Sequence, residues 1–352
     1  MKKTSLYDKH TELKAKLGDF AGFQMPLQYS SVQEEVKAVR NSVGVFDVSH
    51  MGEFLVTGPE TNKFVNYMIT NDFTNLPLLK AVYSPLCKED GGILDDLIAY
   101  KIEEQRAMIC VNASNLEKDW NWFQKHAEKF DVNLTNISDS VSLLAIQGPE
   151  AITLLKDKLN LDIPEGSFSL NAKDSKPSSF NLIARTGYTG EDGVEIFADH
   201  NFISDLWEKL MDNNVTPCGL VARDVLRTEA CFPLYGQELT EDITPLDVGL
   251  KWTVKLEGDD FCSKESLLKA EPKYKSVKLQ IEKGIPRQGY SIWNKGEKVG
   301  SVTSGTFSPT FAKGIAMGLV NSNVNLKEGE FEIEIRGKNV PATRVTKSFL
   351  KA

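Results

Sequence analysis

The sequence has few cysteines, no long apolar run and no excess of positive charge. No stretch approaches the roughly 18 apolar residues that a membrane-spanning helix requires. The net charge is −8, so the chain as a whole does not attract nucleic acid or an anionic membrane surface. We therefore expect neither a nucleic-acid partner nor a membrane location.

The cysteines are odd in number, widely spaced and free of any Cys-x-x-Cys pair: Cys87, Cys110, Cys218, Cys231 and Cys262. This usage is typical of a reducing compartment and argues against structural disulfides and zinc ribbons. The four histidines also lack metal-ligand spacing. The first residues resemble neither a signal peptide nor a transit peptide. We expect a cytoplasmic protein without a metal site.

Four common catalytic signatures are absent as well: Walker A, Gly-x-Gly-x-x-Gly, His-Glu-x-x-His and Gly-x-Ser-x-Gly. The sequence therefore does not support a P-loop site, a dinucleotide fold, a zincin or an α/β-hydrolase. What is present is a set of polar residues in apolar or glycine-rich surroundings.

The 352 residues suit roughly two or three domains. Up to about residue 250, helical and strand patterns alternate. After about residue 275, short strands with turn signals predict a small β-barrel or sandwich. We place the domain boundary within residues 269–276. The helices are predicted over residues 30–44, 115–130, 151–159, 200–213 and 219–231.

A pair of carboxylates, Asp95 and Asp96, interrupts the apolar run of residues 91–100. The run is the second strand of a predicted hairpin over residues 83–102. Successive strand residues face opposite sides, and both faces of this strand are apolar, so alternation does not choose between the two acids. At least one carboxylate is expected in a partly dry cleft, as a general base or as a structural group bonded to backbone N–H groups.

A glycine-rich connection, "RTGYTGEDGVEI" at residues 185–196, joins two predicted strands. Its glycines permit close approach to a flat ligand. Glu195 lies at the start of the second strand, where a carboxylate can accept two parallel N–H bonds. The alternative is a hairpin with a surface glutamate.

Arg223 and Arg227 lie four apart on the predicted helix 219–231 and share a face. Two guanidinium groups together favour a substrate carboxylate or phosphate. Asp224 and Glu229 offer an alternative, a structural ion-pair network. Two further stretches give weaker indications: His50 suits a base or a packed side chain, and the turn-rich stretch 302–311 suits contacts to a polar ligand tail.

Taken together and in order, eight stretches resemble the aminomethyltransferases, the T-proteins of the glycine cleavage system. They are "DFAGFQMPLQY", "VGVFDVSHMGE", "GGILDDL", "AIQGP", "RTGYTGEDGVEI", "GLVARDVLRTEA", "LYGQEL" and "VTSGTFSP". They span nearly the whole chain, so the resemblance covers all of its domains.

The resemblance implies an α+β fold with three domains in a cloverleaf around a central folate pocket. Two interleaved domains would occupy residues 1–270, and a C-terminal β-barrel or jelly-roll-like domain would occupy residues 277–352. It also implies transfer of the methylene carbon from S-aminomethyl-dihydrolipoyl H-protein to tetrahydrofolate. The products would be 5,10-methylenetetrahydrofolate, ammonia and dihydrolipoyl H-protein.

The same resemblance assigns the catalytic acid to Asp96 and leaves Asp95 a supporting role. It assigns pterin binding to Glu195 and folate binding to Arg223. Further residues at matching motif positions are expected to line the pocket: Tyr83, Asn112, Tyr188 and Tyr235.

The expected partners are lipoylated H-protein and, functionally, glycine decarboxylase (P-protein) and dihydrolipoyl dehydrogenase (L-protein), with the chain itself a monomer. Two alternatives share the architecture. One is a folate-dependent demethylase of a sulfonium or N-methyl compound. The other is a non-catalytic folate-binding protein, which is expected to lack the acid that this chain has at position 96.

Overall fold

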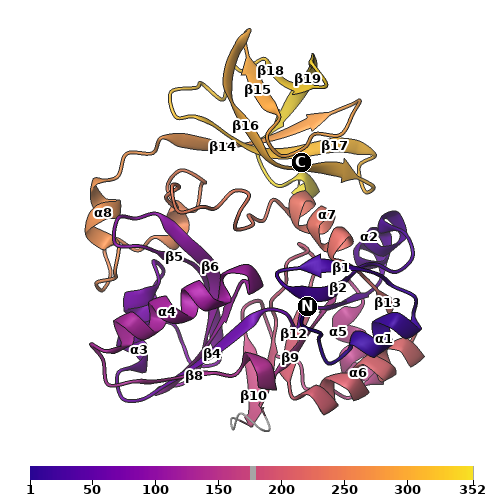
Figure 1. The fold of residues 1–352 in the computed structure, drawn as a ribbon, viewed down its shortest axis with the longest axis vertical. Coiled ribbons are helices and arrows are strands. Elements are labelled where there is room, and N and C mark those ends of the chain that lie inside the picture. The colour runs from indigo at the N-terminus through magenta and orange to yellow at the C-terminus, as the bar shows by residue number, and fades with distance from the viewer. Residues whose placement is uncertain (175–179, 352) are drawn as a thin grey trace.

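The computed structural model describes residues 1–174 and 180–351, which form three lobes around a common centre (Figure 1). Each lobe is built on one main sheet: a six-stranded sheet, a five-stranded sheet and a closed barrel. The arrangement confirms the three-domain α+β prediction and its C-terminal barrel.

The first lobe holds a mixed sheet in the order β10-β11-β12-β9-β3-β13. Its strands are β3 (Gly44–Asp47), β9 (Ser142–Gln147), β10 (Leu170–Asp174), β11 (Asn181–Ala184), β12 (Gly193–Ala198) and β13 (Thr216–Pro217). A small two-stranded sheet, β1 (Lys16–Phe20) with β2 (Phe23–Gln28), lies beside it. The helices are α1 (Tyr7–Glu12), α2 (Val32–Asn41), α5 (Ala151–Thr153), α6 (His200–Asp212) and α7 (Leu220–Ala230).

The second lobe is an antiparallel sheet in the order β5-β6-β7-β4-β8, packed against two helices. Its strands are β4 (Gly52–Thr57), β5 (Lys80–Cys87), β6 (Ile93–Glu103), β7 (Arg106–Val111) and β8 (Asn133–Asn136). The helices are α3 (Thr61–Met68) and α4 (Leu116–Ala127). In the sequence, the strands of the second lobe therefore lie between β3 and β9 of the first.

The third lobe is a closed barrel with the strand order β14-β17-β16-β15-β18-β19. Its strands are β14 (Tyr274–Ile281), β15 (Ser291–Asn294), β16 (Glu297–Ser308), β17 (Lys313–Asn321), β18 (Phe331–Ile335) and β19 (Lys338–Val345). A segment that contains α8 (Lys264–Lys269) leads from α7 past the second lobe into β14 (Figure 1). This segment brings residues 231–273 alongside all three lobes.

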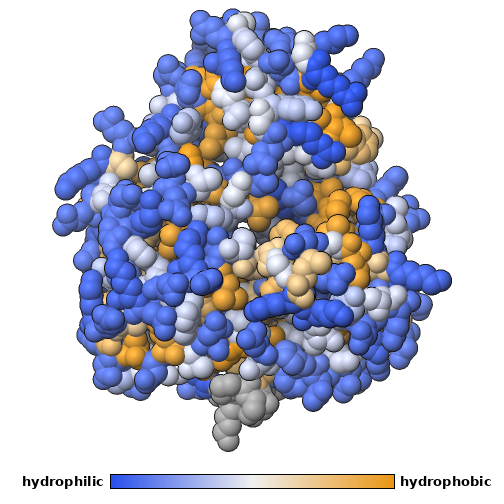
Figure 2. Space-filling model, viewed as in Figure 1, coloured by the Kyte–Doolittle hydropathy of each residue, from blue (hydrophilic) through white to orange (hydrophobic). Residues whose placement is uncertain are grey.

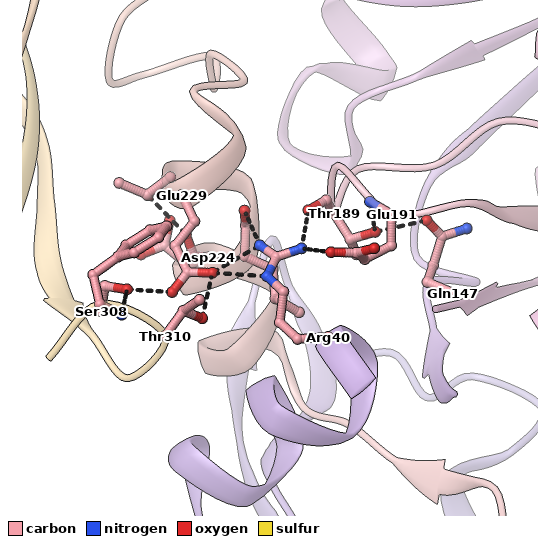
Figure 3. Close-up of polar contacts among 11 residues, drawn as sticks. Arg40, Gln147, Thr189, Glu191, Asp224, Glu229, Ser308 and Thr310 are labelled. Atoms are coloured by element: carbon pink, nitrogen blue, oxygen red, sulfur yellow. Dashed lines mark hydrogen bonds and ion pairs between the residues drawn. The ribbon is translucent and has the colours of Figure 1, made fainter. Parts of the chain in front are cut away.

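A buried arginine joins segments far apart in the sequence (Figure 3). Arg40 of α2 donates from Nη2 to Glu229 Oε2 of α7 at 2.7 Å, and from Nη1 to Glu191 Oε1 at 2.9 Å. Glu229 also accepts hydrogen bonds from Ser308, the last residue of β16, and from Thr310 in the turn that follows. Arg40 and Glu229 therefore fix α2, α7, the glycine-rich connection and the barrel to one another.

The surface in Figure 2 is mostly hydrophilic, with hydrophobic residues gathered beside a hollow between the barrel and the other lobes. Among the described residues, no helix combines the length and the apolar composition that crossing a membrane requires.

Candidate active site

A cavity of about 1450 Å³ lies where the three lobes meet. Asp96 lines it from the second lobe, Glu195 and Arg223 line it from the first, and Lys278 lines it from the barrel. All of the site residues expected from the sequence are among its lining residues: Tyr83, Asp96, Asn112, Tyr188, Glu195, Arg223 and Tyr235. The fold thus brings together side chains that lie up to 152 positions apart, from 83 to 235.

The hairpin β5–β6 resolves the ambiguity between the two aspartates. Leu97 and Ala99, on the face of Asp95, belong to the core that β6 forms with α4. Ile98 and Tyr100, on the face of Asp96, pack against the core of the first lobe and line the cavity, which Leu97 also reaches. Both faces are apolar because one packs against a helix and the other against the first lobe, and of the two acids only Asp96 is a lining residue of the cavity.

Two neutral donors hold the Asp96 carboxylate. Tyr83 donates from its hydroxyl to Oδ2 at 3.0 Å, and Asn112 donates from Nδ2 to Oδ1 at 2.9 Å. Burial, with the charge of Asp95 second, raises the pKa of Asp96 to about 7, although both donors act to lower it. A carboxyl with a pKa near the working pH is suited to taking and giving a proton.

Asp95 is fully buried and has three N–H donors. It accepts hydrogen bonds from the Asn112 backbone N–H at 3.0 Å, from Asn112 Nδ2 at 2.9 Å and from Asn115 Nδ2 at 2.7 Å. Asp95 is not a lining residue of the cavity. Asp95 therefore holds Asn112 behind Asp96, and the supporting role that the resemblance implies for it stays a prediction.

Glu195 lies in β12, between β9 and β11 of the first sheet. Thr186 donates its hydroxyl to Glu195 Oε2 at 2.6 Å, which leaves Oε1 without a protein donor among the described contacts. The side chain is largely buried, at 7% exposure. A buried carboxylate that faces a cavity and has a protein donor on only one oxygen can accept hydrogen bonds from the edge of a ligand.

Arg223 projects from α7 beside Glu195, whose negative charge acts on its guanidinium. The guanidinium carbon lies 4.8 Å from the ring centre of Tyr188. Its Nη1 has no hydrogen-bond partner among the described residues although it is buried. A buried guanidinium with a free donor suits an anionic or carbonyl group of a ligand.

Arg227 belongs to a structural ion-pair network, which was the alternative to a role in ligand binding. It pairs with Asp224 at 2.7 Å and with Glu238 at 3.1 Å, and it donates to Ser304 at 2.8 Å. Glu229 pairs with Arg40 and with neither arginine of its own helix. Sequence spacing predicted the shared face correctly but did not predict which guanidinium is already bonded.

The stretch 302–311 is also placed differently from the sequence expectation. Most of it belongs to β16, and its polar side chains bond inward: Thr303 to Glu238, Ser304 to Arg227 and Ser308 to Glu229. The protein itself therefore uses these hydroxyl groups to hold the barrel against α7.

Sequence reasoning missed Trp252, which lines the cavity with its side chain 59% exposed. Its ring stacks on Tyr83 with 6.2 Å between ring centres. Another missed group is Lys118, which donates to the Tyr235 hydroxyl at 2.8 Å and to Leu94 O at 2.7 Å. The detectable signal for Trp252 was an isolated tryptophan in a segment without helical periodicity.

His50 lines the cavity as a buried, neutral imidazole. Burial lowers its pKa to about 4, and its Nδ1 has no partner among the described residues. Three other potential metal ligands lie within 4.8 Å of one another: Glu89, His126 and Cys262. They are not among the residues that line the cavity. The expectation of no metal stays a prediction.

The comparisons with known proteins agree with this geometry. The chain matches the GCVT N-terminal domain model over residues 6–258 and the glycine cleavage T-protein C-terminal barrel domain model over residues 275–351. It is 48% identical to an aminomethyltransferase of Thermosipho melanesiensis and 47% identical to one of Thermotoga maritima. Both matches cover 100% of this chain and 98% of the relative.

A solved structure, the glycine cleavage system aminomethyltransferase T from Bartonella henselae, superposes with a TM-score of 0.93. The two sequences are 35% identical, and the match covers 99% of this chain and 98% of the Bartonella chain. With both domain models matched in order and the fold shared over its full length, the chain belongs to the glycine cleavage T-protein family of aminomethyltransferases.

Proposed function

We propose that this protein is the aminomethyltransferase of a glycine cleavage system. It transfers the methylene carbon of an aminomethyl group from the dihydrolipoyl arm of H-protein to tetrahydrofolate. The observation that carries the proposal is one cavity that holds a carboxylate with a pKa of about 7, Asp96, together with Glu195 and Arg223. The shared name of the full-length relatives supports the same activity.

The size of the cavity suits two reactants. Pockets for a single small molecule usually measure roughly 300–1,000 Å³, and this one measures about 1450 Å³. The excess space provides room for a folate and for the end of a lipoyl arm at the same time. A lipoyl arm requires an entrance, and the hollow between the lobes in Figure 2 is the candidate for it.

Glu195 and Arg223 bind the folate in this proposal. A pterin presents N3–H and its 2-amino group side by side, and Oε1 of Glu195 is available to accept from that edge. The free Nη1 of Arg223 donates to an acceptor on the same ligand. Tyr188, already stacked against Arg223, limits the movement of that guanidinium.

Asp96 handles the proton at the reacting nitrogen. Folate N5 attacks the aminomethyl carbon, ammonia leaves, and N10 then displaces the lipoyl sulfur to close the five-membered ring. N5 and N10 each give up one proton, which the departing ammonia and the thiol carry away. While Asp96 is ionised, its negative charge stabilises the cationic carbon centre as ammonia departs, and it accepts the N5 proton once N5 has bonded to that carbon.

The partners follow from the same reaction. Lipoylated H-protein brings the aminomethyl group, and the glycine decarboxylase and dihydrolipoyl dehydrogenase act before and after on the same arm. We further propose that the protein acts as a monomer in the cytoplasm. All five cysteines are free in the structure, which suits a reducing compartment, and the relatives named above are from bacteria.

A single assay tests the proposal. The protein is mixed with aminomethylated lipoyl H-protein and tetrahydrofolate, and both ammonia and methylenetetrahydrofolate are followed. We expect equimolar formation of the two products, and none when H-protein carries no lipoyl group. Demethylation of a sulfonium compound without this reaction, or folate binding without turnover, would replace the proposal by one of the two alternatives.

A further inference from the structure

A second buried acid lies behind the aspartate pair. α4 places Asp119 against the face of β6 that carries Asp95, and both side chains are 0% exposed. Asn115, which lies four residues before Asp119 and therefore on the same side of the helix, donates to Asp95 Oδ1 at 2.7 Å, so the fold places the Asp119 and Asp95 carboxyl groups next to each other. Sequence spacing contained a signal for Asp119: it lies three residues after Leu116 and four before Phe123, on the apolar face of the helix.

Two carboxyl groups that share one buried site do not both ionise, so the pair carries one proton. Neither oxygen of Asp119 has an N–H or O–H donor among the described residues. The neighbouring ammonium of Lys118 is bonded elsewhere, to Leu94 O at 2.7 Å and to the Tyr235 hydroxyl at 2.8 Å. Burial, and then the charge of Asp95, raises the pKa of Asp119 to about 11. Asp119 is therefore the protonated partner.

Asp95 is the acceptor in this pair. It already receives three N–H bonds, two from Asn112 and one from Asn115. A carboxylate has about four acceptor sites, so the Asp119 hydroxyl completes the set. The carboxylate of Asp95 is then held from two sides, by α4 on one and by the residues that follow β7 on the other.

We propose that Asp119 is a positioning residue for Asp96: it donates its carboxyl hydrogen to Asp95, which orients the Asn112 amide that holds the Asp96 carboxylate. The inference rests on the proposed function only in taking Asp96 as the reacting group. The chain of contacts runs from α4 through β6 and Asn112 to the cavity. The final link is the 2.9 Å hydrogen bond from Asn112 Nδ2 to Asp96 Oδ1.

The first test uses two substitutions that differ only in hydrogen-bond donation. Asp119→Asn keeps a donor toward Asp95, whereas Asp119→Leu has nearly the same volume and no donor. We expect Asp119→Leu to lower kcat roughly tenfold to a hundredfold, the range typical of a misplaced catalytic group, while the Kd for tetrahydrofolate changes less than about twofold. Asp119→Asn should recover most of the lost kcat.

Glu117→Leu is the matched control, since it makes the same kind of change on the exposed face of the same helix. It should leave kcat and Kd unchanged. Equal kcat in Asp119→Leu and the unaltered protein overturns the inference. So does an equal loss of kcat in Asp119→Asn and Asp119→Leu.

A double substitution separates positioning from general damage. If Asp119 acts through Asp95, then Asp119→Leu should lower kcat less than about twofold further in a protein that already carries Asp95→Asn. A full additional loss in that background contradicts the route through Asp95.

Infrared spectroscopy tests the proton without any turnover. At about pH 9, where Asp96 is ionised, we expect the carbonyl bands of buried protonated carboxyl groups. Asp119→Asn should remove one of them, and Glu53→Gln should remove another, since burial also raises the pKa of Glu53 well above its ordinary value. No change in Asp119→Asn overturns the inference even if Asp119→Leu does not fold. If the protein shows the Asp119 band but has no aminomethyltransferase activity, the proposed function is wrong and the protonation of Asp119 still stands.

Discussion

The side-chain amide of Asn112 donates to Asp96 Oδ1 at 2.9 Å. The same nitrogen donates to Asp95 Oδ1 at 2.9 Å and to the Asp96 carbonyl at 3.1 Å. One amide thus fixes both acids of β6 relative to each other. A carboxylate held in this way needs little reorganisation when charge develops next to it, which is the main source of electrostatic catalysis in a buried site.

Replacing the reacting carboxylate tests its role directly. Asp96→Asn retains the shape of the side chain but has no basic oxygen, so we expect kcat to fall by roughly 10²–10⁴-fold, the usual contribution of a general base. Tetrahydrofolate should still bind with a Kd within a few-fold of normal, because Glu195 and Arg223 are unchanged. Rapid-mixing assays and fluorescence titration measure the two quantities. Comparable turnover in the variant would remove Asp96 from the mechanism.

The pH dependence follows from the cause of the raised pKa. Asp96 accepts a proton only when ionised, so kcat/KM should fall as the pH drops below about 7. The negative charge of Asp95 helps raise that pKa, so Asp95→Asn should move the acidic limb of the profile to lower pH. An unmoved limb would mean that a different group controls it. Asp205→Asn, on the first lobe away from the cavity, is the control.

Glu195 should govern affinity more than rate. Glu195→Ala removes the acceptor for the pterin edge, and the loss of a buried charge-assisted hydrogen bond costs about 1.5–3 kcal/mol, which corresponds to roughly a 10- to 150-fold weaker Kd. Isothermal titration with tetrahydrofolate measures the change. Glu297→Ala, on an exposed barrel position, should leave Kd unaltered, and an unaltered Kd in Glu195→Ala as well would refute the pterin role.

Arg40 should govern the attachment of the barrel and the glycine-rich connection. Arg40→Ala leaves the fully buried Glu229 side chain without its guanidinium partner, and breaking a buried ion pair costs about 3–5 kcal/mol of stability. We expect a clearly lower unfolding midpoint and faster proteolysis between the barrel and α7. Lys37→Ala, on the exposed face of the same helix, is expected to change stability by less than about 0.5 kcal/mol. Equal midpoints for the two variants would contradict the structural role.

Glu53 should make the protein less stable as the pH rises. It is buried without a hydrogen-bond partner among the described residues, and burial raises its pKa well above the ordinary value. The unfolded chain therefore loses this proton at a lower pH than the folded chain, so the free energy of unfolding falls as the pH rises above about 4.5. Glu53→Gln should be more stable than the unaltered protein at pH 8, with the difference shrinking toward pH 4. Denaturant titrations at several pH values measure it, and an equal difference at every pH would indicate an ionised Glu53.

The local patterns of the sequence were sufficient for most elements. The capping of α2 at Ser31, the hairpin β5–β6 and the change to short strands near residue 275 all follow from neighbours in the chain. The motif resemblance supplied the three-lobed arrangement and the seven expected site residues, and the cavity includes all seven. Their individual roles remain predictions for the experiments above.

Other features depend on partners that are distant in the sequence. Glu229 pairs with Arg40, 189 positions away, although closer arginines occur on its own helix. Helical spacing determines which side chains share a face, but only the packing of α2 against α7 determines which guanidinium reaches the carboxylate. For the same reason, three hydroxyl groups of the stretch 302–311 bond to α7 and to the residues that follow it: those of Thr303, Ser304 and Ser308.

The sequence by itself determined that Asp95 and Asp96 face opposite sides of a strand, because the side-chain period of a strand is two residues. It did not determine which acid faces the ligand cavity, because both faces are apolar. Only the tertiary structure decided that, by packing α4 and the Asp119 carboxyl against one face and leaving the cavity of three lobes on the other. A buried carboxylate is available for chemistry if it faces a ligand cavity, and it is structural if other protein groups fill the space around it. The groups that fill this space come from distant parts of the chain.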